Sequence, residues 1–177
     1  MFIDPVNAQE VDFDVPTEIN IIQGRLSVAF HDGVGKQDAT VLMKTLGYPV
    51  LQTHFYDWRS EARSSKMLSE EQVRDIKETP GVLNVSQTAL GNIHTTTASN
   101  APASSAYLIV ITFASHISRN AAKEVLKPFS DFEFTQIASP ANEMVIEVGD
   151  QDEVALAVLQ TQQQVKWVTY VGVGSGG

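Results

Sequence analysis

The sequence predicts an α+β protein made of two consecutive copies of a β-α-β-β-α-β unit, and three observations support this prediction. Within the segment 106–129, residues 107–129 repeat the segment 24–46 at a constant offset of 83 positions, without a gap. Both segments have the pattern of an apolar strand, a turn and an amphipathic helix. The segment 165–169 then repeats 82–86 at the same offset, as expected for two copies of one supersecondary unit.

The equivalent positions of the two copies are almost all apolar, which is typical of core positions. In the first copy they are Leu26, Val28, Phe30, Val34, Ala39, Leu42, Met43, Leu46, Val82 and Val85. In the second copy they are Ile109, Ile111, Phe113, Ile117, Ala122, Val125, Leu126, Phe129, Val165 and Val168. The order β-α-β-β-α-β is that of the ferredoxin-like unit, so we expect two tandem antiparallel sheets with the helices on one face of each.

The repeat divides the chain into five segments. They are an acidic N-terminal arm at 1–23, the first ferredoxin-like copy at 24–86, a polar linker at 87–105, the second copy at 106–171 and a flexible Gly-rich tail at 172–177. The linker carries no charged residue and is rich in Thr, Ser, Ala and Asn, so it has little apolar surface to bury.

The first copy is predicted to start with a strand at 25–30 and a helix at 36–46, which Gly47 ends in a left-handed conformation. A second strand is expected at 49–57. The polar segment 58–66 should be an edge strand or a loop. Ser69 and Gln72 have the spacing of a capping box for a second helix, which ends at Pro80, and a closing strand follows at 82–86.

The second copy is predicted to start with the near-continuous apolar strand 107–113, which should be central in its sheet. Ser118 should cap the next helix. The segments 132–138 and 143–148 are expected to form a hairpin around 139–142, because Ser, Pro and Asn favour turns. The last helix should begin at Asp150 or Asp152, and the segment 165–171 should close the sheet.

The N-terminal arm contains a short strand pattern. Val11, Phe13 and Val15 alternate with Asp12 and Asp14, which indicates a strand with one buried face. Two further apolar residues of the arm are Phe2 and Ile3. These five apolar residues are our candidates for an assembly contact, in which the arm covers a sheet edge of its own chain or of a neighbouring subunit.

Composition and charge exclude several classes of function. The net charge of −9, with no basic stripe along the chain, argues against a nucleic-acid partner. No apolar run approaches the length of a membrane span, and the start lacks the pattern of a secretory signal, so we expect a soluble cytoplasmic or virion-associated protein rather than a secreted one. There is no cysteine, and none of the four histidines is spaced four residues from another, so no metal and no cofactor are expected.

The segments 25–34 and 76–85 resemble the inhibitor I9 family, the propeptides of subtilisin-like proteases. The first matches the opening strand and the Asp32-Gly33-Val34 turn of that family, and the second matches its last helix and closing strand. In the family, the residues after the closing strand occupy the substrate cleft of the protease. The resemblance therefore implies protein-binding segments in both copies, with candidate residues Gln87, Thr88, Ala89, Leu90, Tyr170, Val171 and Gly172.

No catalytic motif accompanies these features, so we do not expect an enzyme. The leading hypothesis is a non-catalytic protein-binding or structural protein, either a subunit of a homomeric assembly such as a virion or a filament, or a module that docks to one partner. One alternative is a propeptide-like inhibitor or folding helper of a subtilisin-type protease. A second alternative is a small-ligand-binding domain pair with its site between the two copies.

Overall fold

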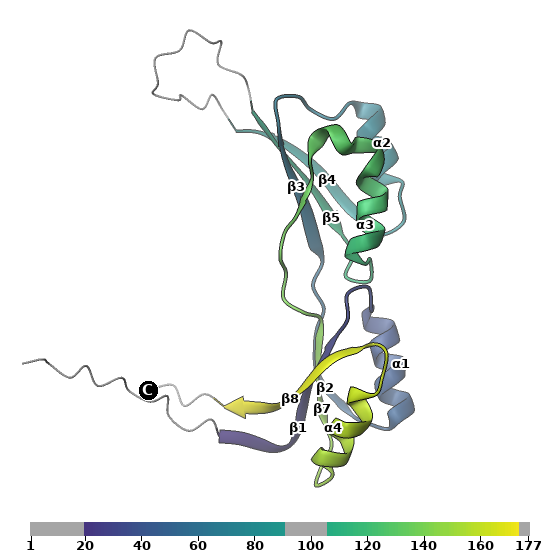
Figure 1. The fold of residues 1–177 in the computed structure, drawn as a ribbon, viewed down its shortest axis with the longest axis vertical. Helices are drawn as coiled ribbons and strands as arrows, with labels where there is room; N and C mark the ends of the chain where they lie inside the picture. Colours follow the sequence, from purple (N-terminus) through teal and green to yellow (C-terminus); the bar gives the residue numbers. More distant parts are fainter. Residues whose placement is uncertain (1–19, 91–105, 174–177) are drawn as a thin grey trace, which may run out of the picture.

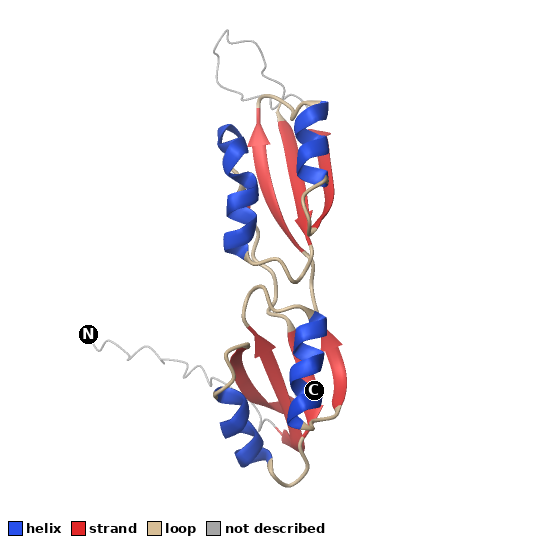
Figure 2. Ribbon diagram, turned by 90° about the vertical axis from the view of Figure 1, so that its right-hand side faces the viewer, coloured by secondary structure: helices blue, strands red, loops and turns tan. Residues whose placement is uncertain are grey.

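The computed structural model describes residues 20–90 and 106–173, and it is a mixed α+β structure. This part of the chain forms two four-stranded antiparallel sheets and four α-helices. Each sheet has two of the helices on one face, and the two sheets follow one another along the long axis of the molecule (Figure 1). Seen from the helix side, the helices lie in front of the strands in both halves (Figure 2).

The first unit is built from the two ends of the described chain. Its sheet has the order β2-β7-β1-β8. Its elements are β1 (Asn20–Phe30), α1 (Lys36–Leu46), β2 (Val50–His54), β7 (Glu143–Glu147), α4 (Asp152–Gln160) and β8 (Val165–Val173).

The second unit is built from the middle of the chain. Its sheet has the order β4-β5-β3-β6. Its elements are β3 (Trp58–Ser64), α2 (Glu70–Lys77), β4 (Val82–Ala89), β5 (Tyr107–Phe113), α3 (Arg119–Leu126), the 3-10 helix η1 (Lys127–Phe132) and β6 (Thr135–Gln136).

The tandem arrangement that the repeat predicts is not confirmed, because each sheet takes strands from both copies. The chain leaves the first sheet after β2, builds the whole second unit, and returns to the first sheet at β7. The first half of each copy thus pairs with the second half of the other copy. The repeat specifies which kinds of strand are neighbours, but equivalent strands have equivalent patterns, so it does not specify which copy supplies them.

The registers of the two sheets show that this exchange is reciprocal. In the first sheet Val28 lies opposite Val168, and in the second Ile111 lies opposite Val85, which is the same pair moved by 83 positions in opposite directions. The pairs Ser27–Thr169 and Val110–Ser86 agree in the same way. Both ladders also have a register shift at the same place, after Ala29 in β1 and after Val82 in β4.

Each unit has its own hydrophobic core between its sheet and its helices, and many of the core residues are equivalent in the repeat. The first core contains Leu26, Val28, Phe30, Ala39, Met43, Met144, Ile146, Ala155, Leu159, Val165 and Val168. The second contains Trp58, Ala62, Leu68, Ile76, Val85, Ile109, Ile111, Phe113, Ala122, Leu126 and Phe132. The alternation of apolar residues on the strands therefore matches burial against the helices.

Several local predictions are confirmed. Gly47 ends α1 with φ of 79°, in the left-handed region. Ser69 and Gln72 form the reciprocal capping box at the start of α2. Ser118 caps α3 by accepting a hydrogen bond from the amide of Ala121.

Two local predictions are wrong. The segment 58–66 is neither an edge strand nor a loop, because β3 lies inside the second sheet between β5 and β6, with Trp58, Ser60 and Ala62 facing the core. The hairpin around 139–142 is absent as well. The strand before this segment, β6, pairs with β3, whereas the strand after it, β7, pairs with β1 and β2.

Candidate functional site

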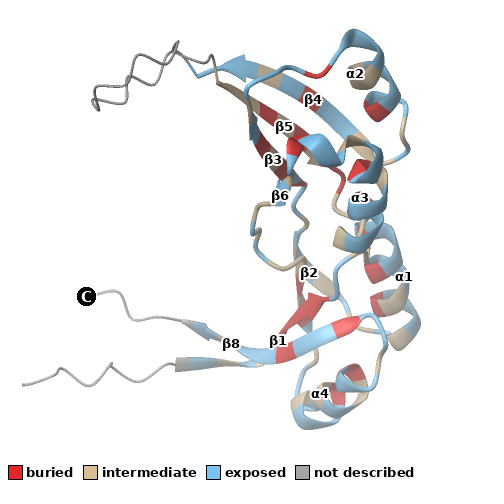
Figure 3. Ribbon diagram, turned by 45° about the horizontal axis from the view of Figure 1, so that its top comes forward, coloured by how far each residue is buried: buried red, intermediate tan, exposed pale blue. Residues whose placement is uncertain are grey.

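The edge strand β8 is our primary candidate site. It has nine residues, and in the described part of the chain it pairs on one side with β1 while no strand pairs with its outer side. The side chains of Trp167 and Tyr170 are 39% and 36% exposed on it, and Figure 3 shows most of the strand as exposed. Its single charged residue is Lys166. Natural edge strands are usually protected by charges, prolines or short length, and β8 has little such protection.

The directions of the backbone groups of β8 follow from the hydrogen bonds of β1. The amide of Phe30 donates to Asn142 on the β7 side, and the amide of His31 donates to Gln164 on the β8 side. Because these directions alternate along a strand, the backbone N–H and C=O groups of Ser27 and Ala29 also point toward β8. The backbone groups of their partners Thr169 and Trp167 therefore point toward β1. Those of Val168 and Tyr170 face the open edge.

The two side-chain faces of β8 differ in character. Val168 and Tyr170 lie opposite Val28 and Leu26, so they are on the helix face of the sheet. Trp167 and Thr169 lie opposite Ala29 and Ser27 on the other face, which no helix of the described residues covers. A strand added to this edge would accordingly meet Val168 and Tyr170 on the helix face, and one aromatic and one polar residue, Trp167 and Thr169, on the other face.

The structure does not bring the two predicted partner-binding segments together. Gln87, Thr88 and Ala89 are at the end of β4 in the second unit, whereas Tyr170, Val171 and Gly172 are near the end of β8 in the first unit (Figure 1). The amide of Leu90 donates to the carbonyl of Ala106 at 2.8 Å, which extends the β4–β5 ladder. The arm residues Phe2, Ile3, Val11, Phe13 and Val15 lie outside the described residues.

Gln87 and Tyr170 are equivalent in the repeat, yet only Gln87 is engaged by a neighbouring loop in the part of the structure that is described. Its Oε1 accepts a hydrogen bond from the amide of Leu68 at 2.6 Å, and its Nε2 donates to the Leu68 carbonyl at 3.3 Å. The loop before α2 is therefore fastened to β4. Tyr170 has no such contact among the described residues, so the edge of β8 is the more accessible of the two.

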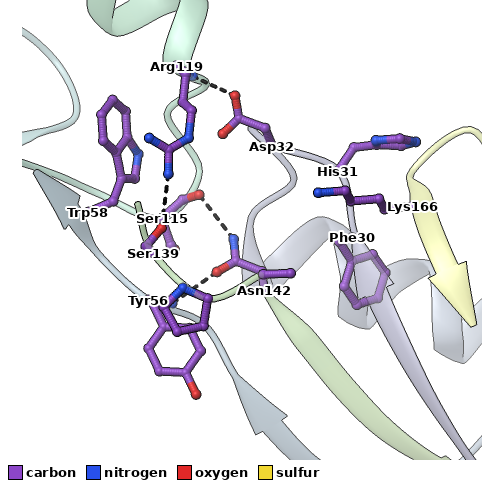
Figure 4. A pocket seen from close by; sticks show the side chains of 12 residues that line it. Phe30, His31, Asp32, Tyr56, Trp58, Ser115, Arg119, Ser139, Asn142 and Lys166 are labelled. Carbon is purple, nitrogen blue, oxygen red and sulfur yellow. Dashed lines mark hydrogen bonds between the residues drawn. The ribbon is translucent and has the colours of Figure 1, made fainter. Parts of the chain in front are cut away.

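The junction between the units contains the second candidate site. The chain crosses from one unit to the other at 55–57 and again at 137–142. Asn142, in the second crossing, is hydrogen-bonded to the first. Its Oδ1 accepts from the amide of Tyr56 at 3.0 Å, and its Nδ2 donates to the carbonyl of Ser115, after β5, at 3.3 Å (Figure 4). The carboxylate of Asp57 also accepts from the amide of Ser115, at 3.2 Å.

Asp32 and Arg119 connect the same region. Asp32 lies in the turn after β1, and its Oδ2 accepts from the amide of Arg119 at 2.6 Å, at the start of α3. A carboxylate is favourable there because the first amides of a helix are positively polarised. The Arg119 side chain passes 5.0 Å from the ring of Trp58 and donates to the carbonyl of Ile137 and to Ser139 Oγ.

These residues enclose a cavity of about 130 Å³ between the units. Its lining includes two cationic side chains, Arg119 and Lys166, together with His31 and the carboxylate of Asp32 (Figure 4). A cavity of about 150 Å³ in another protein binds a molecule of the size of benzene. The cavity therefore has room for a small ligand.

Neither site supplies an obvious catalytic or metal-binding arrangement. Within residues 20–90 and 106–173, no three His, Asp or Glu side chains are grouped so that they could hold a metal ion. None of the helices in these ranges has the length and apolar character needed to span a membrane.

Sequence reasoning missed Trp167 and the junction residues Asn142, Arg119 and Asp32. A signal for the first was present, because Trp167 is an apolar residue between the buried Val165 and Val168 on a strand. No signal marked the junction residues, since they approach one another only because the halves are exchanged.

Comparison with known proteins adds no family to this description. No family model, no curated protein and no solved structure matches the chain.

Proposed function

We propose that this chain is a non-catalytic protein-binding or assembly protein, and that a protein partner adds a strand to the open edge of β8. The single observation that carries the proposal is this edge, which has outward amides at Val168 and Tyr170 beside exposed aromatic side chains. Strand addition supplies affinity through backbone hydrogen bonds and specificity through alternating side chains. We further propose that both units are ferredoxin-like and that the second is inserted into the first.

A test of this function uses short peptides selected for binding to the full chain from a displayed library. Replacing Tyr170 by proline removes one outward amide without breaking the ladder to β1. Tyr170→Thr is the matched control, since it removes the aromatic ring but keeps the amide. We expect selected peptides to bind the Thr variant within about tenfold of the wild type, a loss near 1.4 kcal/mol, and to lose binding to the Pro variant.

Hydrogen exchange locates the bound peptide in the same experiment. Protection of the amides of Val168 and Tyr170 on peptide binding would support the proposal. Peptides that bind the Pro variant as well as the wild type, or that protect other strands only, would contradict it.

The cavity at the junction favours a second candidate function, binding of a small anion between the units. Arg119 and Lys166 both line it, and the only carboxylate in its lining, that of Asp32, already accepts the Arg119 amide. Ligand sites are frequently located between domains. We expect phosphate or acetate to raise the melting temperature of the wild type more than that of a Lys166→Gln variant, and equal shifts would count against this site.

A further inference from the structure

The two edges β4 and β8 are equivalent in the repeat but differ in the side chains they expose. Where β8 has Trp167 and Tyr170, β4 has Asn84 and Gln87. Gln87 fastens the loop at Leu68, whereas both aromatic residues of β8 are more than one-third exposed. The first unit therefore presents an edge with two exposed aromatic residues, whereas the exposed large apolar residue of β4 is Leu83.

We propose that the strand received by β8 is the segment 11–15 of a second copy of this chain. This inference rests on the proposed function, and it names the partner. The segment reads Val-Asp-Phe-Asp-Val, so Val11, Phe13 and Val15 share one face and Asp12 and Asp14 share the other. The apolar face of such a strand would continue the helix face of β8, beside Val168 and Tyr170. The aspartates would lie on the uncovered face, beside Thr169 and the exposed Trp167, and in contact with water.

The position of the arm favours a second copy over the same chain. Asn20, where β1 begins, lies opposite Val173 at the outer end of β8. To reach the outer side of its own β8, the segment 11–15 would have to reverse direction within residues 16–19 and pass over the end of that strand. It would then run parallel to β8, and parallel pairing is slightly less stable than antiparallel pairing. An arm from another molecule can pair antiparallel without this reversal.

The same geometry predicts a closed pair. Because the arm emerges at the end of the strand that receives it, two copies related by a two-fold axis can exchange arms reciprocally. Each copy then donates one arm and covers one edge, so no free edge of this kind is left to extend the assembly.

The test is the molar mass of the full chain by light scattering after size-exclusion chromatography, over a range of concentrations. We expect the wild type to have twice the 19.3 kDa mass of the chain. Phe13→Asp, in the arm, and Tyr170→Pro, on the edge, should each give the mass of a single chain. The matched controls Thr17→Asp and Tyr170→Thr should keep the doubled mass, because they leave the apolar face of the arm and the edge amide intact.

Circular dichroism melting of all four variants separates loss of pairing from loss of folding. If the Tyr170→Pro variant fails to fold, the molar mass of the Phe13→Asp variant decides the test, because Phe13 lies outside the described units. If the full chain is monomeric at every concentration, the inference is overturned. The proposal that a partner strand binds β8 would then still be tested by the peptide experiment. A doubled mass that survives Phe13→Asp but is lost in Tyr170→Pro would also overturn it, and would indicate that the edges pair directly.

Discussion

The two units have the same strand registers but fill their cores differently, and the difference lies in one strand. In the first unit β7 places Met144 and Ile146 opposite Val28 and Leu26. In the second unit β3 places Ser60 and Ala62 opposite Ile111 and Ile109. The second core thus receives less volume from this strand, and Trp58 compensates at its end by stacking on Phe113 with ring centroids 4.8 Å apart.

This comparison shows that the duplication preserved the pairing of the strands more strictly than the identity of their residues. Cores tolerate such changes when the total volume and the apolar pattern are kept. Asn142 has the place in the first sheet that Trp58 has in the second, at an offset of 84 instead of 83 positions, and both side chains donate to equivalent carbonyls. Trp58 Nε1 donates to Ile117 at 3.0 Å, and Asn142 Nδ2 donates to Val34 at 3.4 Å.

The largest expected effect comes from cutting the chain inside residues 91–105. Both sheets contain strands from each side of the cut, and the amide of Leu90 already bonds the carbonyl of Ala106. We therefore expect the two pieces to remain bound one to one and to separate only in denaturant. Native mass spectrometry of the cleaved protein makes the measurement. Two pieces that separate as folded monomers would show that each copy closes on itself, as in a tandem arrangement.

The next largest effect should come from the equivalent core residues Phe113 and Phe30, which are 1% and 2% exposed. Replacing either by alanine should reduce the free energy of unfolding by about 3–5 kcal/mol. The two losses should be similar, because Phe113 stacks on Trp58 and Phe30 packs against Phe55 with ring centroids 5.8 Å apart, and each such aromatic pair adds about 0.5–1.5 kcal/mol. Urea unfolding followed by fluorescence and circular dichroism would measure both.

The control for this pair is Leu51→Ala on the edge strand β2, where the side chain is 41% exposed. Its cost should stay within about 0.5 kcal/mol. If Phe30→Ala proved as mild as this control, the first unit would not depend on its central strand in the way the second does.

The sequence predicted the strands and helices well because their evidence is local. Central strands such as 107–113 have alternating or continuous apolar residues, and helix ends such as Gly47 and Ser69 have specific backbone and capping requirements. The exchange of halves could not be predicted in this way, since equivalent strands satisfy the same pattern in either arrangement.

One signal against a tandem hairpin was nevertheless present. Among the residues Phe55, Tyr56 and Asp57 between β2 and β3, only Asp57 is of a type that tight turns favour. The chain runs from one unit to the other at this point. The second crossing, 137–142, does contain turn residues, and for that reason its sequence indicates a hairpin.

The polarity of 58–66 predicts an edge strand or a loop, and this prediction fails for a related reason. Arg59, Glu61 and Arg63 alternate with core residues and lie on the sheet face that no helix covers. Their charges indicate a solvent-exposed face. An interior strand also has such a face when helices cover only one side of its sheet.

A smaller effect is expected at the junction, where Asp32 and Ser115 are equivalent in the repeat. Only Asp32 uses its side chain to accept the first amide of α3, from Arg119. Asp32→Ala should therefore cost about 1 kcal/mol of the free energy of unfolding, as the loss of a helix cap does. Ser115→Ala should cost less, because Ser115 contributes its backbone amide and carbonyl to the junction.

Asp32→Asn is the informative control for this effect in thermal or urea unfolding. Asparagine keeps an oxygen acceptor for the Arg119 amide but removes the charge, so its cost should be intermediate. A cost equal to that of alanine would assign the effect to charge at the helix end instead of to the hydrogen bond.

The smallest effect, and one of opposite sign, is expected at Ser60. This side chain is fully buried in the second core, and its Oγ has no hydrogen-bond partner among the described residues. A buried hydroxyl without a partner loses its bond to water on folding, so Ser60→Ala should raise the free energy of unfolding by up to about 1 kcal/mol. The void left by one oxygen atom should offset part of this gain.

Ser27→Ala provides the comparison for this prediction, because its Oγ also has no partner within the described chain but its residue is 9% exposed on the uncovered face of the first sheet. Water is closer to Ser27 than to Ser60, so the gain should be smaller there. If Ser60→Ala instead destabilised the protein by 1 kcal/mol or more, about the value of one satisfied hydrogen bond, its hydroxyl must be bonded in solution. The second core would then be held partly by a polar contact at the position where the first core has the thioether of Met144.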